Sequence, residues 1–224
     1  MLAIIGGTSL LDYSSSKLQK IKQHTPYGSS EILRGDGFLL LMRHQHRCAP
    51  HVIPYLAHIA ALKLAGADRI VAFGSTGSYH PELTPGSRII PDDFIMLDPA
   101  PTLYNHSIGH ATPVFDLAIR EKISEITPDA KFGGIYLQTT GPRLESKAEI
   151  SWQSKIADVV GMTIGSEASV SAELEIPFAA ICTIDNYAHG ICNSGISYDS
   201  IIEKVRENHE NSVHLLEEII EHLR

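Results

Sequence analysis

The sequence predicts an α/β fold in which a mostly parallel or mixed β-sheet is covered by α-helices on both faces. Short apolar runs alternate along the chain with longer segments of helical periodicity. The apolar runs are nearly continuous, which is typical of strands that are buried on both faces. The chain has 224 residues and 43% hydrophobic content. We therefore expect one domain over residues 1–224, with a core large enough to be stable.

Six apolar runs predict strands, and four segments between or after them predict helices. The strands are Leu2–Ile5, Phe38–Met42, Arg69–Phe73, Gly134–Leu137, Asp158–Met162 and Phe178–Thr183. The helices are Val52–Ala65, Glu145–Ile156, Glu167–Leu174 and Tyr198–Leu223. The first helix ends before Gly66, a suitable C′ residue, and the last carries one apolar stripe at steps of three or four. In such sheets, ligands bind outside the carboxyl ends of the strands.

Composition excludes several classes of partner. The net charge is −8, and no Lys/Arg-rich run is present, so nucleic acid and membrane surfaces are poor partners. The N-terminus has no basic segment before a long apolar one, and no run approaches the roughly 18 apolar residues of a membrane span. Cys48, Cys182 and Cys192 lack metal-type spacing and suit a reducing compartment. We expect a cytoplasmic protein that acts on small molecules.

Three motifs in the first half of the chain follow predicted strands and suit an anion. Gly6-Gly7-Thr8 places two glycines and a hydroxyl after the first strand, and Gly74–Ser78 after the third suits a nest of backbone amides for phosphate, with Ser75 and Thr76 as hydroxyl donors. Arg43-His44 follows the second strand, where a guanidinium fork matches phosphate oxygens. Each glycine motif alone is equally compatible with an ordinary turn. Neither has the G-x-G-x-x-G spacing of a dinucleotide site.

Histidines near Arg43 raise the question of a metal. His46, His51 and His58 follow closely, but no Cys or carboxylate joins them at ligand spacing. We expect no metal, and we interpret His51 and His58 as surface residues.

The second half contains three more motifs. In Thr139–Glu149, a Gly-Pro loop enters a predicted helix, and Glu145 is either a helix-start residue in solvent or an acceptor for a ligand N–H. Gly161-Met162-Thr163 again marks a strand end. In Thr183–Gly190 an apolar strand stops abruptly in polar residues, and Asn186 can donate and accept at once, as reading a heterocycle requires.

Taken in order, these motifs resemble the trimeric branch of the purine nucleoside phosphorylases, which includes methylthioadenosine phosphorylase. The resemblance covers nearly the whole chain, and the ordered set is far more specific than any one member. It implies a mixed central sheet, partly a distorted barrel, flanked by helices. It implies phosphorolysis of a purine nucleoside with inorganic phosphate as co-substrate and no other cofactor. It also implies a homotrimer, sometimes paired into a hexamer, in which His110 lies in the segment that reaches a neighbouring subunit.

The resemblance assigns roles to residues of this chain. Phosphate would be held by Thr8, Arg43, His44, Gly74, Ser75 and Thr163. The nucleoside would contact Met162, Glu145, Asn186, Tyr187, Ala188 and Ile196. The catalytic groups would be Asn186, Arg43 and His44. With Arg43 interpreted as a surface-loop donor, Arg43→Ala should weaken phosphate use with little effect on folding.

Departures from the adenine-type pattern point to a narrower substrate. That branch usually has Asp at the positions of Asn186 and Ala188 and a small residue at Glu145, whereas 6-oxopurine enzymes have Glu and Asn as here. Ile196 stands where enzymes for a free 5′-hydroxyl often have His. An isoleucine offers that hydroxyl no hydrogen bond but packs well on a methylthio group. The sequence therefore predicts an S-methyl-5′-thioinosine phosphorylase, with a general inosine/guanosine phosphorylase or a methylthioadenosine phosphorylase as alternatives.

Two other classes of function differ in the residues that they require. A dinucleotide-dependent oxidoreductase requires a glycine fingerprint and a ribose-binding carboxylate about 20 residues later, and neither is present. A purine-binding regulatory protein would keep Asn186 and Glu145 but need not keep Arg43 and Thr163.

Overall fold

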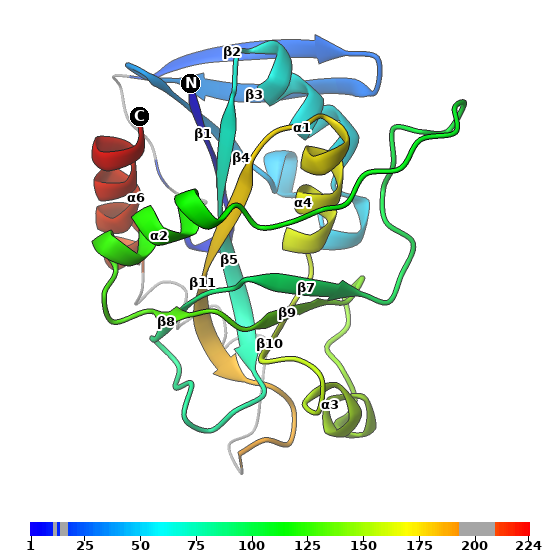
Figure 1. Ribbon diagram of the computed structural model, residues 1–224, viewed down its shortest axis with the longest axis vertical. Helices are drawn as coiled ribbons and strands as arrows, with labels where there is room; N and C mark the ends of the chain where they lie inside the picture. The colour runs from blue at the N-terminus through cyan, green and yellow to red at the C-terminus, as the bar shows by residue number, and fades with distance from the viewer. Residues whose placement is uncertain (11–12, 14–17, 193–208) are drawn as a thin grey trace.

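The computed structural model describes residues 1–10, 13, 18–192 and 209–224. Its centre is a mixed sheet of eleven strands, with helices on both faces (Figure 1). The strands are β1 Leu2–Gly6, β2 Gln19–Thr25, β3 Gly28–Arg34, β4 Phe38–Met42, β5 Arg69–Ser78, β6 Arg88–Ile90, β7 Asp93–Met96, β8 Lys131–Phe132, β9 Ile135–Gln138, β10 Val159–Gly161 and β11 Phe178–Tyr187. The helices in the described residues are α1 Tyr55–Leu64, α2 Leu117–Ile126, α3 Lys147–Gln153, α4 Ile164–Glu173 and α6 His209–Leu223.

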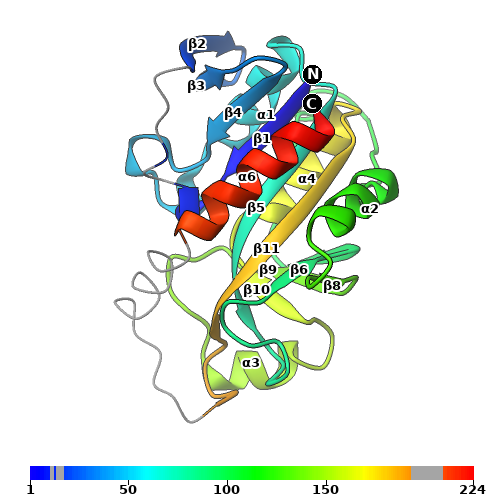
Figure 2. The same ribbon diagram turned by 90° about the vertical axis from the view of Figure 1, so that its left-hand side faces the viewer.

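Apolar residues on successive positions of β1 enter two different cores. Ala3 and Ile5 pack in the cluster that includes residues of α1 and α4, and Leu2 and Ile4 pack in the cluster that includes residues of α2 and α6. Side chains alternate between the faces of a strand, so a strand that is apolar throughout needs a helical layer on each side. Figure 2 shows α6 and α2 on one side of the sheet and α4 on the other. The expected α/β architecture is confirmed.

The sheet divides at β5, and this division positions the site. The strands β4, β1, β5 and β11 are mutually parallel neighbours, so their carboxyl ends meet at one place. β11 follows β5 along its whole length, but on the other edge β1 pairs only as far as Ala72 and β10 begins at Gly77. Among the described residues, no strand therefore lies beside residues 73–76 of β5 on that edge.

Two strands are longer than expected. The stretch Gly74–Ser78 was expected to leave the strand, either as an amide nest for phosphate or as an ordinary turn, but it continues β5, because each of its residues pairs with β11. Likewise β11 does not stop at Thr183; it runs to Tyr187 through a β-bulge in which Ile184 lies opposite Thr76 and Asn186 opposite Gly77. The extra residue of this bulge is Asp185. Bulges are frequent next to active sites, where they redirect a side chain.

The helices α1, α3 and α4 begin and end within a few residues of their expected positions, whereas α2 was not expected, and one of these boundaries matters for the site. α3 begins at Lys147, and Ser146 caps it in a capping box with Glu149. Glu145 therefore precedes the helix and is 7% exposed, so the alternative of a helix-start residue in solvent was wrong. Residues 198–208 of the expected last helix, and Ile196, lie outside the described residues.

Candidate functional site

Arg43 is the first predicted site residue that the structure places differently from expectation. Its side chain is 2% exposed and forms two hydrogen bonds with Glu167, from Nε at 2.7 Å and from Nη2 at 2.9 Å. Nη1 donates to the Phe73 carbonyl at 2.6 Å, at the open edge of β5. Burial opposes the charge, but Glu167 outweighs burial and raises the pKa of Arg43. The interpretation of Arg43 as a surface-loop donor was wrong, and Arg43→Ala would leave a buried carboxylate unpaired.

The glycines at the end of β1 bring the backbone against this guanidinium. The Arg43 amide donates to the Gly6 carbonyl at 3.1 Å. A Cβ on Gly7 would lie 2.7 Å from Nη1 of Arg43 and 2.8 Å from the Phe73 carbonyl oxygen. Thr8 follows at the start of a short 3-10 helix and is partly exposed. The carboxyl ends of β1 and β4 thus bring Thr8 and Arg43 to the open edge of β5.

The turn after Arg43 fixes His44. The His44 Nδ1 donates to the Cys48 carbonyl at 2.8 Å, and burial is the main cause that lowers the pKa of this imidazole. Neutral His44 therefore keeps a lone pair on Nε2 for a ligand. His46 and Arg47 have φ values of 55° and 58°, an uncommon conformation for residues with a Cβ. Such strain is often found at functional sites.

His58 is not the surface residue that was expected. It lies in α1, is 3% exposed, and has its pKa lowered to about 4, mainly by burial and then by Arg43 and His44. Within the described part of the chain, no group of three or more His, Cys, Asp and Glu side chains is arranged to hold a metal ion.

Thr163 precedes α4, and a buried tyrosine fixes this segment. The Tyr136 hydroxyl accepts from the Thr163 amide at 3.2 Å and from the Ile164 amide at 3.4 Å. Burial is the main cause that raises the pKa of Tyr136 far above its usual value. Glu167 lies in the first turn of the same helix, so its pair with Arg43 joins Thr163 to the carboxyl end of β4.

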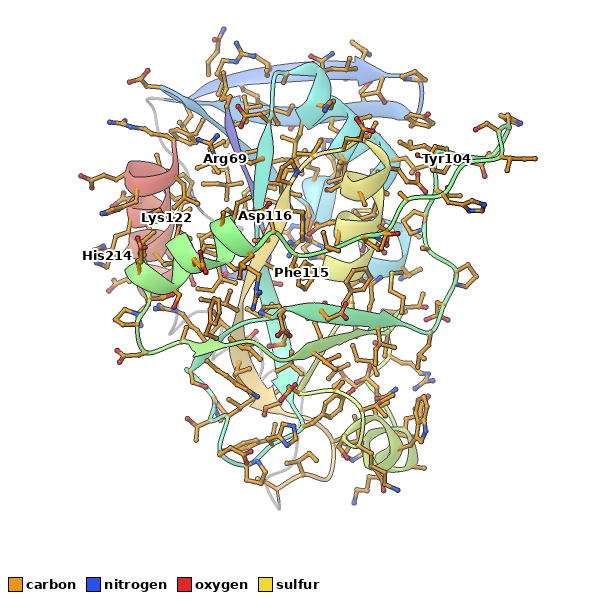
Figure 3. All side chains as sticks on the ribbon, viewed as in Figure 1. Arg69, Tyr104, Phe115, Asp116, Lys122 and His214 are labelled. Atoms are coloured by element: carbon orange, nitrogen blue, oxygen red, sulfur yellow. The ribbon has the colours of Figure 1, made fainter. Side chains whose placement is uncertain are left out.

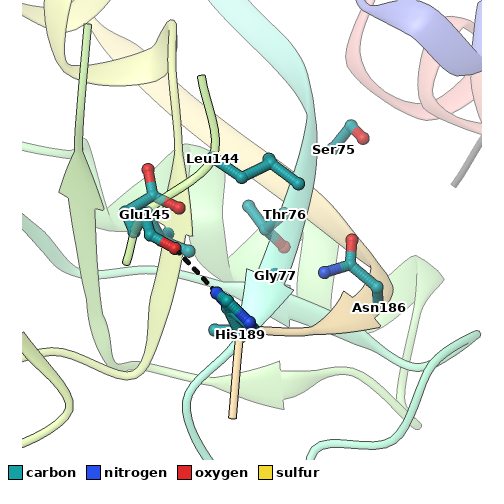
Figure 4. Close-up of a pocket in the computed structure, with 9 residues that line it drawn as sticks. Ser75, Thr76, Gly77, Leu144, Glu145, Asn186 and His189 are labelled. Atoms are coloured by element: carbon teal, nitrogen blue, oxygen red, sulfur yellow. Dashed lines mark hydrogen bonds between the residues drawn. The ribbon is translucent and has the colours of Figure 1, made fainter. Parts of the chain in front are cut away.

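A pocket of about 110 Å³ lies beside the open edge of β5 (Figure 4). Its walls come from the middle of β5, the end of β10, the end of β11 and the loop before α3. The lining residues are Ser75, Thr76, Gly77, Leu144, Glu145, Val160, Asn186, Ala188 and His189. Four of them were predicted site residues, namely Ser75, Glu145, Asn186 and Ala188. Residues more than 100 positions apart in the chain are thereby brought to one place.

Glu145 and Asn186 lie on opposite sides of this pocket (Figure 4). The Thr139 hydroxyl donates to Oε1 of Glu145 at 2.6 Å, and the His189 Nδ1 donates to the Glu145 carbonyl at 3.2 Å. Nδ2 of Asn186 donates to the Tyr187 carbonyl at 2.8 Å, and a Cβ on Gly77 would lie 3.3 Å from that nitrogen. An amide nitrogen has two hydrogens, so Asn186 keeps one donor and its carbonyl oxygen for a ligand. The pocket therefore offers an oriented carboxylate on one side and a donor and an acceptor on the other.

Other predicted residues lie outside this pocket's lining. The Tyr187 hydroxyl donates to the Pro81 carbonyl at 3.1 Å, so its ring is directed toward Pro81. Met162 packs against Gly141, where a Cβ would lie 2.5 Å from its sulfur. His110 is exposed and lies on the arm formed by residues 97–114, which connects β7 to α2 and includes Tyr104, labelled in Figure 3.

Sequence reasoning gave no role to three residues that shape the site. Glu167 was noted only as the start of a helix, Thr139 only as part of the Gly-Pro motif, and Asp185 only as a neighbour of Asn186. Asp185 is 3% exposed and accepts a hydrogen bond from the Ser75 hydroxyl. A carboxylate within an apolar strand was a signal that could have found Asp185, because a buried carboxylate requires a partner.

Comparisons with known proteins identify the family of this chain. The sequence profile of the Phosphorylase superfamily matches residues 2–221. The chain is 41% identical to a probable 6-oxopurine nucleoside phosphorylase of Archaeoglobus fulgidus, over 98% of this chain and 96% of that protein. It is 34% identical to a probable S-methyl-5′-thioinosine phosphorylase of Methanocaldococcus jannaschii, over 98% and 92%.

Solved structures show the same fold. Methylthioadenosine phosphorylase from Schistosoma mansoni, solved in complex with adenine, superposes with a TM-score of 0.86 at 20% identity, covering 98% of this chain and 90% of that one. Among the helices of the described residues, none is long and apolar enough to cross a membrane.

Proposed function

The chain belongs to the Phosphorylase superfamily, and we propose that it cleaves 6-oxopurine nucleosides with inorganic phosphate. The products are the free purine and a ribose 1-phosphate. The observation that carries this proposal is the pair formed by the buried Glu145 carboxylate and the Asn186 amide on opposite sides of one pocket. Relatives named for 6-oxopurine nucleosides and for S-methyl-5′-thioinosine add support.

The base preference follows from hydrogen-bond polarity. A 6-oxopurine has a donor at N1 and an acceptor at O6, and adenine has the reverse. An ionised Glu145 only accepts, and Thr139 already occupies one of its oxygens, so the other is available for N1–H. Asn186 donates to O6 or N7. Adenine would leave Glu145 facing a lone pair, and each such mismatch costs about 1–3 kcal/mol.

The reaction requires positioning and charge stabilisation rather than a protein nucleophile. Phosphate attacks the anomeric carbon as the bond to the purine nitrogen breaks, and the electrons of that bond leave on the purine. Arg43 and Thr8 at the strand ends would donate to the phosphate oxygens, and neutral His44 would accept from a P–OH group, with Gly74, Ser75 and Thr163 beside them. Asn186 would donate to N7 as negative charge develops there, a contribution of about 10²–10³ in rate for one such donor.

The proposal extends to the sugar substituent, the cellular compartment and the oligomeric state. A methylthio group at the sugar 5′ position is our preferred substituent, on the sequence argument at Ile196, with inosine/guanosine phosphorolysis as the alternative. We also propose a cytoplasmic homotrimer. The arm 97–114 supports this, because Ile108 is 99% exposed and Val114 68% exposed, which favours burial against another subunit.

One assay tests the function directly. Release of free hypoxanthine is measured from methylthioinosine and from inosine, each with and without phosphate. We expect release that requires phosphate, and a higher kcat/KM for methylthioinosine. Methylthioadenosine is the matched control for the base. Faster cleavage of methylthioadenosine would contradict the assigned base, and cleavage without phosphate would contradict phosphorolysis.

A further inference from the structure

A buried carboxyl lies directly behind the pocket, and the reaction described above does not use it. Asp185 is the bulge residue of β11 and is 3% exposed. Its Oδ2 accepts from the Ser75 hydroxyl, which belongs to the part of β5 without a strand on its other edge. Ser75 itself lines the pocket. Asp185 is therefore connected to the pocket through the hydroxyl of Ser75.

The protonation state of Asp185 decides what Ser75 offers to a ligand. A hydroxyl has one hydrogen, and an ionised carboxylate only accepts. While Asp185 is ionised, that hydrogen is directed away from the pocket, and Ser75 presents only lone pairs there. A protonated Asp185 donates to the Ser75 oxygen instead. The Ser75 hydrogen is then available to a ligand in the pocket.

The surroundings of Asp185 place its change of protonation within an experimentally accessible pH range. Burial raises the pKa of Asp185 to about 6, although the hydrogen bond from Ser75 opposes that shift. Among the described residues, the Cys182 thiol interacts electrostatically with Asp185 and with the Arg43–Glu167 ion pair, Arg88 lies opposite Thr183 on β6, and Glu145 and His189 line the same pocket as Ser75. At neutral pH the carboxyl is mostly ionised, and below about pH 6 it is mostly protonated.

We propose that Asp185 is a positioning residue that sets the direction of the Ser75 hydrogen bond, and thereby controls how well the site accepts an oxyanion. The protonated form makes Ser75 a donor to the oxyanion. The ionised form withdraws that donor and places a negative charge one hydroxyl away from the ligand, where it disfavours a second anion. The identity of this oxyanion as phosphate rests on the proposed function.

The test is the pH dependence of phosphate KM in wild type and Asp185→Asn. The asparagine is close to Asp in shape, is neutral at every pH, and donates from Nδ2 to Ser75. Phosphate titrates identically in both assays, so the ratio of the two KM values removes its own ionisation. We expect the phosphate KM of wild type, divided by that of Asp185→Asn, to be near one at pH 5 and to rise about tenfold or more by pH 8. This is the effect of one hydrogen bond to a charged group. A ratio that stays constant from pH 5 to pH 8 would overturn the proposal.

Ser75→Ala supplies the second variant, which keeps the test decisive if Asp185→Asn does not fold. Without the hydroxyl there is no hydrogen bond to redirect, so phosphate KM of Ser75→Ala should exceed that of wild type at pH 5 and approach it at pH 8. The opposite trend would contradict the proposed direction. The KM for nucleoside, measured in parallel, should not follow this pattern.

Calorimetry of phosphate binding, with no nucleoside present, distinguishes failure of this inference from failure of the proposed function. If no nucleoside is cleaved at any pH, the proposed function fails, and the pH dependence of phosphate affinity in the same variants still decides the role of Asp185. If cleavage occurs but the affinities of wild type and Asp185→Asn change in parallel, the inference alone fails.

Discussion

Glu167 accepts two hydrogen bonds from Arg43, at 2.7 Å and 2.9 Å, although each side chain is only 2% exposed. The carboxylate comes from the first turn of α4, and the guanidinium follows β4, so the pair joins two elements that meet at the candidate phosphate site. One N–H on each terminal nitrogen of Arg43 is not used by these contacts or by Phe73, and remains for an anion.

Arg43→Ala should lower the free energy of unfolding by about 3–5 kcal/mol, because it leaves the Glu167 carboxylate buried and unpaired. Urea unfolding measures this. Arg143→Ala is the matched control, since Arg143 makes the same two-point contact with Glu149, at 2.9 Å and 2.7 Å, on the exposed surface. We expect little change in its unfolding midpoint. Equal effects of the two variants would show that burial of the Arg43 pair does not matter.

Gly7→Ala and Gly77→Ala should separate the two halves of the site. A Cβ at Gly7 would lie 2.7 Å from Nη1 of Arg43, so this variant should mainly raise the KM for phosphate. A Cβ at Gly77 would lie 3.3 Å from Nδ2 of Asn186, so that variant should mainly raise the KM for nucleoside. Steady-state kinetics with each substrate varied in turn checks both. The assignment of the two halves is wrong if both variants raise the same KM.

Glu145→Gln should reduce the preference for inosine-type over adenosine-type bases by about 100-fold or more, because glutamine can donate to adenine N1.

Thr139→Val should lower kcat/KM for inosine-type substrates by about tenfold, since it removes one hydrogen bond that orients Glu145. Thr140→Val is the control for Thr139→Val: its hydroxyl donates to Asp98 instead. A larger loss in Thr140→Val than in Thr139→Val would contradict this account.

Acid should destabilise the protein through His58. Burial is the main cause that lowers its pKa from 6.5 to about 4, so the folded state binds fewer protons than the unfolded state between these values. The stability contributed by neutral His58 is therefore complete above pH 6.5 and is lost as the pH falls toward 4, by up to about 3 kcal/mol. His58→Gln should flatten this part of the stability profile. His214→Gln, which removes an exposed imidazole, should leave the profile unchanged.

The sequence predicted the central strands well, because continuous apolar runs such as Phe38–Met42 are buried on both faces and need no tertiary information to recognise. It missed the hairpin Gln19–Thr25 and Gly28–Arg34 because these strands are mostly polar: Ile21 is the one apolar residue of the first, and Ile32 and Leu33 are the apolar residues of the second. It also missed α2, although the Asp116 side chain caps that helix at the Ile119 amide, a signal present in the sequence.

The sequence drew attention to residues of the candidate site but did not give their geometry. Thr8, Arg43, Ser75 and Asn186 were noted because they follow predicted strands, Glu145 because it enters a predicted helix, and their roles were implied by the family resemblance. Whether Arg43 was exposed could not be predicted, because its partner Glu167 is 124 residues away in the chain. The course of residues 74–78 and of the bulge at Asp185 depends on pairing between β5 and β11, which small residues alone do not specify.

Around the open edge of β5, which lies between β1 and β10, separate parts of the chain supply the groups for the two substrates. The groups suited to an anion come from strand ends in the N-terminal third and from the start of α4, whereas the groups suited to a base come from the loop before α3 and the end of β11. Substitutions in the second set can alter which heterocycle is accepted while the first set stays intact. Such a fold can come to accept a different purine as the leaving group while the residues that bind the attacking phosphate stay unchanged.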